Sequence, residues 1–322
     1  MGCRFELVLA GTDAPTLRAA GDRALDEIAS LHDRLSAFDP VSTLSRINRE
    51  AHTAPIAVAG DLFDLLALAH RVWAESAGAF DPTIGPLMRL WGLRGESPNC
   101  PPDHAALDAA RARVGFAHVD LDAASCSVRL ARPGMQLDLG AIAKGHAIDV
   151  ALAILRDAGV PAALIHAGTS SVGAIGAPPG LQAWHVRVRP RAPGPTLGVR
   201  LRDACLGVSE PGGRVAHVGS RDVGHVIDPR SGVPVESAGA ALVVARSGAL
   251  ADAWSTALLV LARRPTTLDA ASDGPATGPT TSTTTSAVLA RGAWTIDDPR
   301  GCIDVDAPAD SHTTPPPLGG ST

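Results

Sequence analysis

Cysteine is scarce in this sequence, and the cysteines that are present form no pattern. Five cysteines are scattered over 322 residues, with no C-x-x-C pair and an odd total. This distribution argues against a disulfide framework and against a zinc knuckle. The first residues also lack a basic segment followed by an apolar one, and no apolar run is long enough to span a membrane. The sequence as written therefore predicts a cytoplasmic protein without a transmembrane segment.

Positive charge and aromatic residues are scarce as well. The chain has 28 Lys and Arg residues against 33 Asp and Glu, a net charge of −5. No basic field is available to hold nucleic acid or an anionic membrane surface, so a nucleic-acid partner is not expected. Tyr is absent and the number of Phe residues is 5. In such a chain a given phenylalanine is more often part of the core than a platform for a ligand.

Apolar residues are plentiful, and their spacing indicates both helices and strands. They make up 45% of the chain, enough for the core of one large domain or two small ones. Apolar positions recur every three or four residues over 17–35 and 61–77, which is typical of amphipathic helices. The stretch between them, which carries Phe38 and Asn48, is expected to be a loop. Strands are expected at 5–10, 118–121, 127–130, 162–166, 184–189, 196–201, 205–209 and 240–245. Because no regular strand-helix-strand repeat links them, we expect an α+β fold in a single domain, with mixed β-sheets packed against helices.

The composition changes near the C-terminus. From 265 to 286 the chain is rich in Thr, Ser, Pro and Gly, and the tail 305–322 is similar. Both segments have few of the large apolar residues that a packed core needs, so both are expected to be disordered or loosely attached. Between them, 287–304 is expected to supply one last strand. The main folded domain is therefore expected to span 1–264.

The clearest motif is the run 137–145, Leu-Asp-Leu-Gly-Ala-Ile-Ala-Lys-Gly. A strand ending at 137–139 is expected to break at Gly140, and a helix to begin near Lys144 and stop at Gly159. Backbone N–H groups at a helix start, with an ammonium group beside them, favour an anion such as a pyrophosphate. The order Lys-Gly differs from the Gly-Lys-Ser/Thr of a Walker A loop. Lys144 taken alone is also compatible with a solvated lysine, and Asp138 with an N-cap, a ligand contact or both.

A second motif, 251–256, offers oxygen atoms on one face of a helix. Asp252 and Thr256 are four residues apart, so their side chains project from the same face, with Ser255 beside them. Oxygen ligands with a single carboxylate suit Mg²⁺ shared with substrate phosphates, whereas Zn²⁺ favours His or Cys. Spacing alone favours a simpler alternative, in which the carboxylate interacts with the helix dipole and the hydroxyl bonds to its own helix.

Several segments, taken in order along the chain, resemble the FAD:protein FMN transferase family, also called ApbE. The similarity extends from Met1 to about Leu261. It includes 1–3, 35–40 with Ser42 and Asn48, 78–92, 138–145, 225–234 and 251–256. Agreement in order over many segments is far more specific than any one motif.

The resemblance implies an activity and a set of site residues. An ApbE-like domain is expected to hold FAD in a cleft between its two halves. With Mg²⁺ as cofactor, it is expected to transfer FMN to a threonine hydroxyl of an acceptor protein and to release AMP. The resemblance assigns the metal site to the carbonyl of Ala141 and to Asp252 and Thr256, with Ser255 as a further candidate. It assigns FAD contacts to Met1, Phe38, Ala79, Phe80, Asp81, Asp138, Lys144 and Val226.

The general base is a hypothesis of its own. His225 is the first candidate, because histidine ordinarily titrates near neutrality. It is equally compatible with a structural role in its turn, and the nearby Asp228 is the alternative base.

Many relatives carry a Met-Gly-Thr motif after a leader, and this chain begins at that motif. An exported or membrane-anchored protein is therefore the alternative if a leader is missing.

Two other functions would use the same parts. An FAD pyrophosphatase would give FMN and AMP with water as the acceptor, and a non-catalytic protein would bind FAD without turnover. Departures from the family pattern bear on this choice. In 168–171 relatives commonly have a second glycine and often an acidic residue, and in 208–212 they have Ser/Thr-Ser-Gly. Cys3 stands where Thr is frequent, and Phe38 where Tyr is frequent.

Overall fold

The structure is a computed structural model, and it describes residues 3–190, 197–213, 215–236, 239–261, 286–290 and 294–295. Of 189–190, 286–290 and 294–295 only the backbone is described. Met1, the tail 305–322 and nearly all of the tract 265–286 lie outside the described residues. No described helix is both long and apolar enough to cross a bilayer.

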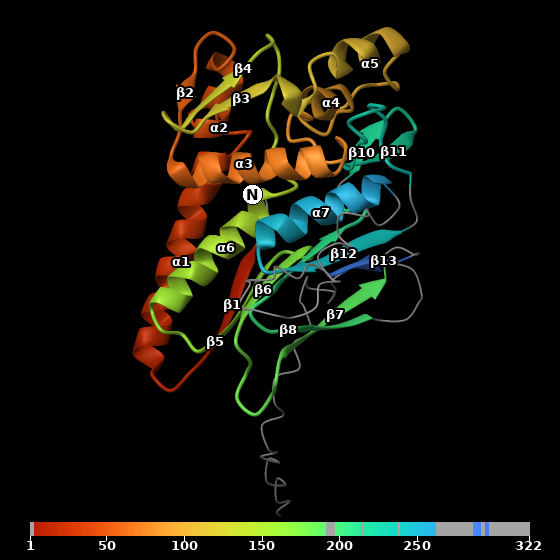
Figure 1. Cartoon of the computed structure of the whole chain (residues 1–322). Coiled ribbons are helices and arrows are strands. Elements are labelled where there is room, and N and C mark those ends of the chain that lie inside the picture. Colours follow the sequence, from red (N-terminus) through yellow and green to blue (C-terminus); the bar gives the residue numbers. More distant parts are fainter. Residues whose placement is uncertain are drawn as a thin grey trace, which may run out of the picture.

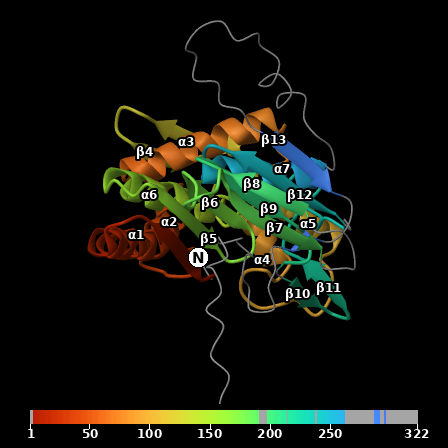
Figure 2. The same cartoon turned by 90° about the horizontal axis from the view of Figure 1, so that it is seen from below.

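A six-stranded sheet forms the centre of the molecule (Figures 1 and 2). In spatial order its strands are β1 (Phe5–Ala10), β5 (Ala162–Ala167), β6 (Ser171–Ile175), β9 (Cys205–Ser209), β12 (Ala240–Ala245) and β13 (Ser286–Ala290). All neighbouring strands pair antiparallel; Ser171 of β6, for example, lies opposite Gly207 of β9. The inner strand β5 is a continuous apolar run apart from His166, and it is buried along its whole length.

Helices cover one face of this sheet (Figure 1). They are α1 (Ala14–Leu35), α6 (Ala143–Asp157) and α7 (Gly248–Leu261), and α3 (Gly60–Glu75) packs on α7. Asp13 caps α1 by accepting a hydrogen bond from the backbone N–H of Thr16, and a proline occupies its first turn. Gly159, with φ +73°, follows the end of α6, because a left-handed residue ends a helix most easily when it is glycine.

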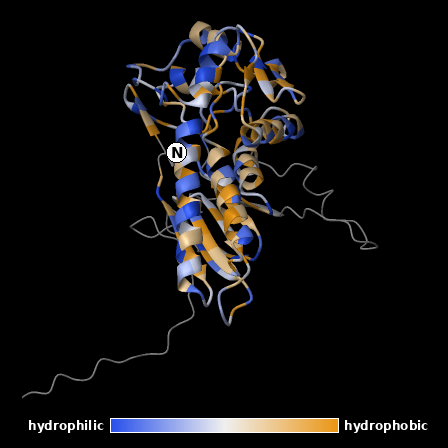
Figure 3. Ribbon diagram, turned by 90° about the vertical axis from the view of Figure 1, so that its left-hand side faces the viewer, coloured by the Kyte–Doolittle hydropathy of each residue, from blue (hydrophilic) through white to orange (hydrophobic). Residues whose placement is uncertain are grey.

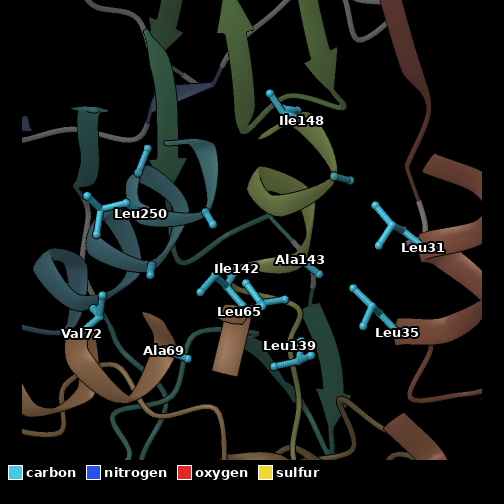
Figure 4. Packing of buried hydrophobic residues seen from close by; sticks show 14 of the residues in the cluster. Leu31, Leu35, Leu65, Ala69, Val72, Leu139, Ile142, Ala143, Ile148 and Leu250 are labelled. Atoms are coloured by element: carbon cyan, nitrogen blue, oxygen red, sulfur yellow. The ribbon is translucent and has the colours of Figure 1, made fainter. Parts of the chain in front are cut away.

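The four helices share one core with the turn that precedes α6. Figure 4 shows Leu31 and Leu35 of α1 and Leu65 of α3 pointing toward Ile142, which is fully buried, and Leu250 of α7 belongs to the same cluster. Hydrophobic and hydrophilic residues alternate along the helices, and the strands beneath them are mostly hydrophobic (Figure 3). This packing fixes the turn at 138–142 relative to α7.

A second layer of strands covers the opposite face of the sheet (Figure 2). Here β7 (Trp184–Pro190) pairs with β8 (Leu197–Leu201) and with β14 (Trp294–Thr295). Trp184 and Val186 pack against Leu164 and Val172 of the central sheet in a second buried cluster. The segment expected to supply one last strand thus contains β14 and most of β13.

Smaller elements surround the end of the helix layer. They are α2 (Thr43–Glu50), β2 (Ile56–Ala57), α4 (Gly85–Leu90), α5 (His104–Arg111), the 3₁₀-helix η1 (Phe116–His118), β3 (Val119–Asp122), β4 (Ser127–Leu130), β10 (Val215–Val218) and β11 (Arg221–Gly224). A third buried cluster of the molecule lies among them and joins Leu87 and Leu93 to Val218 and Ile227. The hairpin of β10 and β11 is thereby attached to the segment around α4.

The α+β architecture in a single domain is confirmed, and two local predictions are wrong. The stretch around 43–50, expected as a loop, is helix α2, because Ser42 caps it and Leu44 and Ile47 are buried. The strand expected to end at 137–139 is extended chain with one isolated bridge, between Gln136 and Ile84. The carboxamide of Asn48 takes the place of a neighbouring strand, since it accepts from the N–H of Leu137 and donates to its carbonyl.

His146 on α6 provides a test of the helix packing. Burial lowers its pKa from 6.5, with Asp149 and Asp61 opposing this effect, and its Nε2 has no hydrogen-bond partner among the described residues. Because the unfolded chain then binds the proton more readily, the free energy of unfolding should fall as pH decreases below 6.5. We expect His146→Gln to make this decrease shallower in chemical denaturation measured between pH 5 and 7. Parallel pH profiles for the two proteins would contradict the assignment.

Candidate active site

A cavity of about 600 Å³ lies where the central sheet, the starts of α6 and α7, and the surrounding loops meet. Ten of the predicted site residues line it: Ala79, Phe80, Asp81, Asp138, Ala141, Lys144, His225, Val226, Asp252 and Thr256. They come from four separate stretches of the sequence. A second cavity of about 220 Å³ adjoins the first, since Arg94 and Asp138 line both.

The two motifs meet through the starts of helices α6 and α7. The N–H of Gly145 donates to Oδ2 of Asp252 at 2.8 Å, across 107 residues of sequence. Such an approach is possible because Gly145 has no side chain: a Cβ there would lie 2.0 Å from the carbonyl oxygen of Gly248. The carboxylate of Asp149 fixes the start of α7, accepting from the N–H groups of Gly248 and Ala249.

Asp252 is buried yet faces the cavity. Its side chain is held by Ser171 of β6, whose hydroxyl lies 2.7 Å from Oδ1 and 3.0 Å from Oδ2. Burial raises the pKa of Asp252 to about 6, although Lys144 and the hydrogen bonds from Ser171 and Gly145 act in the opposite direction. A carboxylate of this kind gains from a cation placed beside it, because the cation compensates for the lost hydration.

The composition of the cavity fits a hard divalent cation. Among its described lining residues, five carboxylates (Glu6, Asp81, Asp138, Glu210 and Asp252) outnumber the three groups of Arg4, Arg94 and Lys144. No three His, Cys, Asp or Glu side chains of the described part of the chain gather as a metal cluster. A cation at Asp252 would therefore be bound through hydroxyl and carbonyl oxygens and through the ligand, as Mg²⁺ commonly is.

The two hydroxyl groups near Asp252 lie in different places. Thr256 lines the cavity, and its Oγ1 is 3.1 Å from Oγ of Ser209 on β9. Ser255 is 1% exposed and does not line the cavity. Its hydroxyl donates to the carbonyl of Asp252 and lies 2.7 Å from that of Ser209. Thr256 is therefore the better placed of the two for a metal, while Ser255 ties the helix face to β9.

Several backbone N–H groups in the turn 138–144 and at the start of α6 already have acceptors within the protein. Those of Ile142 and Ala143 donate to the carbonyl of Leu139, and that of Gly145 donates to Asp252. An anion at this helix start would therefore rely on side chains more than on the expected row of N–H groups. The ammonium of Lys144, 3.4 Å from the carbonyl of Gly140, is the nearest cation to Asp252 that the turn provides.

The loop 79–81 is held rigidly. Phe80 is 3% exposed and belongs to the main core. The carboxylate of Asp81 accepts hydrogen bonds from the backbone and hydroxyl of Thr83 and from the N–H of Phe116. Burial raises the pKa of Asp81 against these bonds. The loop thus forms a fixed wall of the cavity.

His225 and Asp228 differ in their surroundings. His225 is half-buried and lines the cavity, close to Gly213, where a Cβ would come within 3.0 Å of Cε1. The side chain of Asp228 is held by Nε and Nη2 of Arg230, at 2.8 and 2.7 Å. Burial alone would raise the pKa of Asp228, but these bonds outweigh it, so the pKa is lowered. Such a carboxylate is a weak base, and Asp228 is outside the cavity lining.

Comparison with known proteins agrees with these observations. The family model described as "ApbE family" matches residues 1–272. The chain belongs to the ApbE family.

Relatives and solved structures extend this result. The chain is 30% identical over 275 residues to an FAD:protein FMN transferase of Klebsiella pneumoniae, covering 81% of this chain and 76% of the relative. It is 34% identical over 259 residues to one of Treponema pallidum, covering 74% and 71%. The flavin transferase ApbE of Vibrio cholerae superposes with a TM-score of 0.70 at 27% identity, covering 81% of this chain and 84% of that one. An ApbE protein of Thermotoga maritima gives 0.75 at 25% identity, covering 91% and 93%.

Four residues near the ApbE cavity were missed as site residues by the sequence reasoning. Asn48 bonds to the backbone of Leu137, and Arg94 to the carboxylate of Asp138. Ser171 bonds to the carboxylate of Asp252, and Ser209 to the hydroxyl of Thr256. Ser171 and Ser209 lie in the segments 168–171 and 208–212, which depart from the ApbE pattern, and that departure is the signal that could have found them. Phe38, assigned to FAD by the resemblance, lines the smaller cavity, where its ring lies under Arg94.

Proposed function

We propose that this chain transfers FMN from FAD to a threonine hydroxyl of an acceptor protein and releases AMP. The observation that carries the proposal is the meeting of Asp252 with the Lys144 turn in one large cavity. The relatives named FAD:protein FMN transferase, similar over about four fifths of the chain or slightly less, support the same reaction.

The reaction exchanges the phosphoanhydride bond of FAD for a phosphoester bond to the acceptor. The acceptor oxygen forms a bond to the phosphorus of the FMN half, and the bond from that phosphorus to the bridging oxygen breaks. The hydroxyl proton passes to a base, and AMP leaves with the electron pair of the broken bond. Catalysis then requires charge neutralisation at the diphosphate and alignment of the nucleophile.

The chain's own residues can meet these needs. Lys144 places an ammonium beside the turn that borders the cavity, and the rigid loop 79–81 limits where the dinucleotide can lie. Asp252 and Thr256, with the carbonyl of Ala141, are the oxygens that would hold Mg²⁺. When bound there, Mg²⁺ would polarise the phosphoryl oxygens and offset their negative charge.

His225 is proposed as the group that accepts the hydroxyl proton. It lines the cavity, whereas Asp228 is paired with Arg230. We expect His225→Ala to lower the rate of FMN transfer on the order of 10²- to 10⁴-fold, with FAD affinity little changed. Transfer is measured as covalent flavin on the acceptor, and affinity by quenching of flavin fluorescence. Undiminished transfer would remove His225 from the mechanism.

One assay separates this function from its alternatives. The protein is incubated with FAD and Mg²⁺, with and without an extract of its host cell, and AMP and in-gel flavin fluorescence are followed. A transferase gives both products only with the acceptor, and mass spectrometry then identifies the modified residue. AMP without an acceptor would indicate a pyrophosphatase. FAD that stays intact and bound would indicate a binding protein.

A further inference from the structure

Arg94 lies at the boundary between the two cavities. It follows α4, and its backbone N–H and that of Leu93 both donate to the carbonyl of Met88, which fixes the chain at this point. Its side chain is 16% exposed and lines both cavities. Nothing in the catalytic scheme above uses it.

The guanidinium of Arg94 is oriented by two neighbours. Its Nε and Nη2 donate to the same oxygen of Asp138, Oδ2, at 2.7 and 2.5 Å. The other oxygen of Asp138 accepts from the N–H of Gly140 at 2.8 Å. The ring of Phe38 stacks on the guanidinium, with Cζ 4.1 Å from the ring centroid. The guanidinium is thus held beside the turn 138–144, and both oxygens of Asp138 accept hydrogen bonds.

One donor of this guanidinium is left over. Nη1 is buried and has no hydrogen-bond partner among the described residues. A buried donor without an acceptor is costly, and those found in folded proteins commonly have a ligand or another functional reason. Phe38, whose ring stacks on this guanidinium, is itself 63% exposed.

The charge of the cavity indicates which ligand would benefit. Asp138 is 7% exposed and borders the same turn as Lys144. Without Arg94 its carboxylate would face an anionic ligand uncompensated, in a cavity where acidic lining residues already outnumber basic ones. A planar guanidinium with a remaining N–H is well suited to a phosphate oxygen.

We propose that Arg94 is a binding residue for the diphosphate of the dinucleotide, compensating Asp138 and donating from Nη1 to a phosphate oxygen. This inference rests on the proposed function, because it takes FAD as the ligand of the large cavity. Arg94 and Lys144 would then approach the diphosphate from the two ends of the turn 138–144.

Affinities for FAD and ADP test the proposal. ADP carries a diphosphate and lacks the flavin ring, and its affinity is obtained from competition with FAD, both in the presence of Mg²⁺. We expect Arg94→Ala to weaken both ligands by a similar factor, about tenfold or more, and Arg94→Lys to give an intermediate loss. Arg89→Ala is the matched control, since it removes an exposed arginine that lines only the smaller cavity.

Each other outcome overturns the proposal. A loss for FAD alone would indicate a contact with the flavin ring, and an equal loss in Arg89→Ala would indicate a general effect of charge. Unchanged affinities, or ADP that fails to compete with FAD in the wild type, would exclude a diphosphate contact. If Arg94→Ala does not fold, Arg94→Lys carries the test, because it does not leave a buried carboxylate without compensation.

The result is separable from the function. A wild-type protein that binds FAD and ADP through Arg94 but gives no covalent flavin would refute the transferase and leave the inference standing. If the wild type transfers FMN and the Arg94→Ala variant binds FAD and ADP normally, the inference about Arg94 is refuted and the transferase function stands.

Discussion

Asp252→Asn is expected to lower kcat/KM for FMN transfer on the order of 10³-fold. The carboxamide has nearly the same shape, and its oxygen can still accept the hydrogen bond from Gly145, so the helices should keep their positions. What is lost is the negative charge that would hold a divalent cation beside the diphosphate. Initial rates of AMP release with acceptor and FAD, taken at several Mg²⁺ concentrations, measure the effect.

Two controls separate the charge from the fold. Asp122→Asn removes an exposed carboxylate at the end of β3, outside the lining of the large cavity, and it should leave the rate unchanged. Chelation of divalent ions should abolish transfer by the wild type, and added Mg²⁺ should restore it. A variant at Asp252 that keeps the wild-type rate and the wild-type Mg²⁺ dependence would refute the metal site, and with it the main physical argument for catalysis.

The prediction depends on a contact that spacing alone did not favour. A helix was predicted at the motif 251–256, but spacing alone favoured a simpler role for its oxygen-bearing face, with the carboxylate at the helix dipole and the hydroxyl bonded to its own helix. The order of motifs along the chain, through the resemblance to the ApbE family, pointed to a shared site. The structure then showed why Asp252 differs from a surface carboxylate: it is buried, and Gly145 and Ser171 both donate to it.

The parts that the sequence did not reveal are long-range contacts of polar side chains. Periodicity predicts α1 and α3, because an apolar stripe repeats within each helix. The helices α6 and α7 were predicted from the motifs at 137–145 and 251–256. Asn48 pairs with the backbone of Leu137 across 89 residues, and Arg94 reaches Asp138 across 44. No local pattern records such a pair, since each residue by itself is typical of a loop. The false strand at 137–139 has the same origin, because Asn48 supplies what a neighbouring strand would have supplied.

Gly145→Ala is expected to have the largest effect on stability. Two arguments oppose each other here. Alanine is a better helix former than glycine by about 1 kcal/mol, which taken alone would stabilise α6. However, the new Cβ would lie 2.0 Å from the carbonyl oxygen of Gly248 and 2.6 Å from the N–H nitrogen of Ala249, and backbone atoms cannot rotate aside as a side chain can. Overpacking of this kind costs roughly 3 kcal/mol or more.

The steric clash should therefore outweigh the gain in helix propensity, and it should lower the rate of catalysis as well as the stability. Separating α6 from α7 breaks the hydrogen bond from Gly145 to Asp252 and moves the carboxylate away from the lysine turn. We expect a free energy of unfolding lower by about 3 kcal/mol in chemical denaturation, and loss of FMN transfer even where the protein remains folded. Gly60→Ala is the matched control, because Gly60 begins α3 and a Cβ there meets nothing within 4 Å. That variant should be as stable as the wild type or slightly more so, since only the helix-propensity term applies to it. If Gly145→Ala behaved like Gly60→Ala, the close approach of the two helices, and the joining of the two motifs that follows from it, would be wrong.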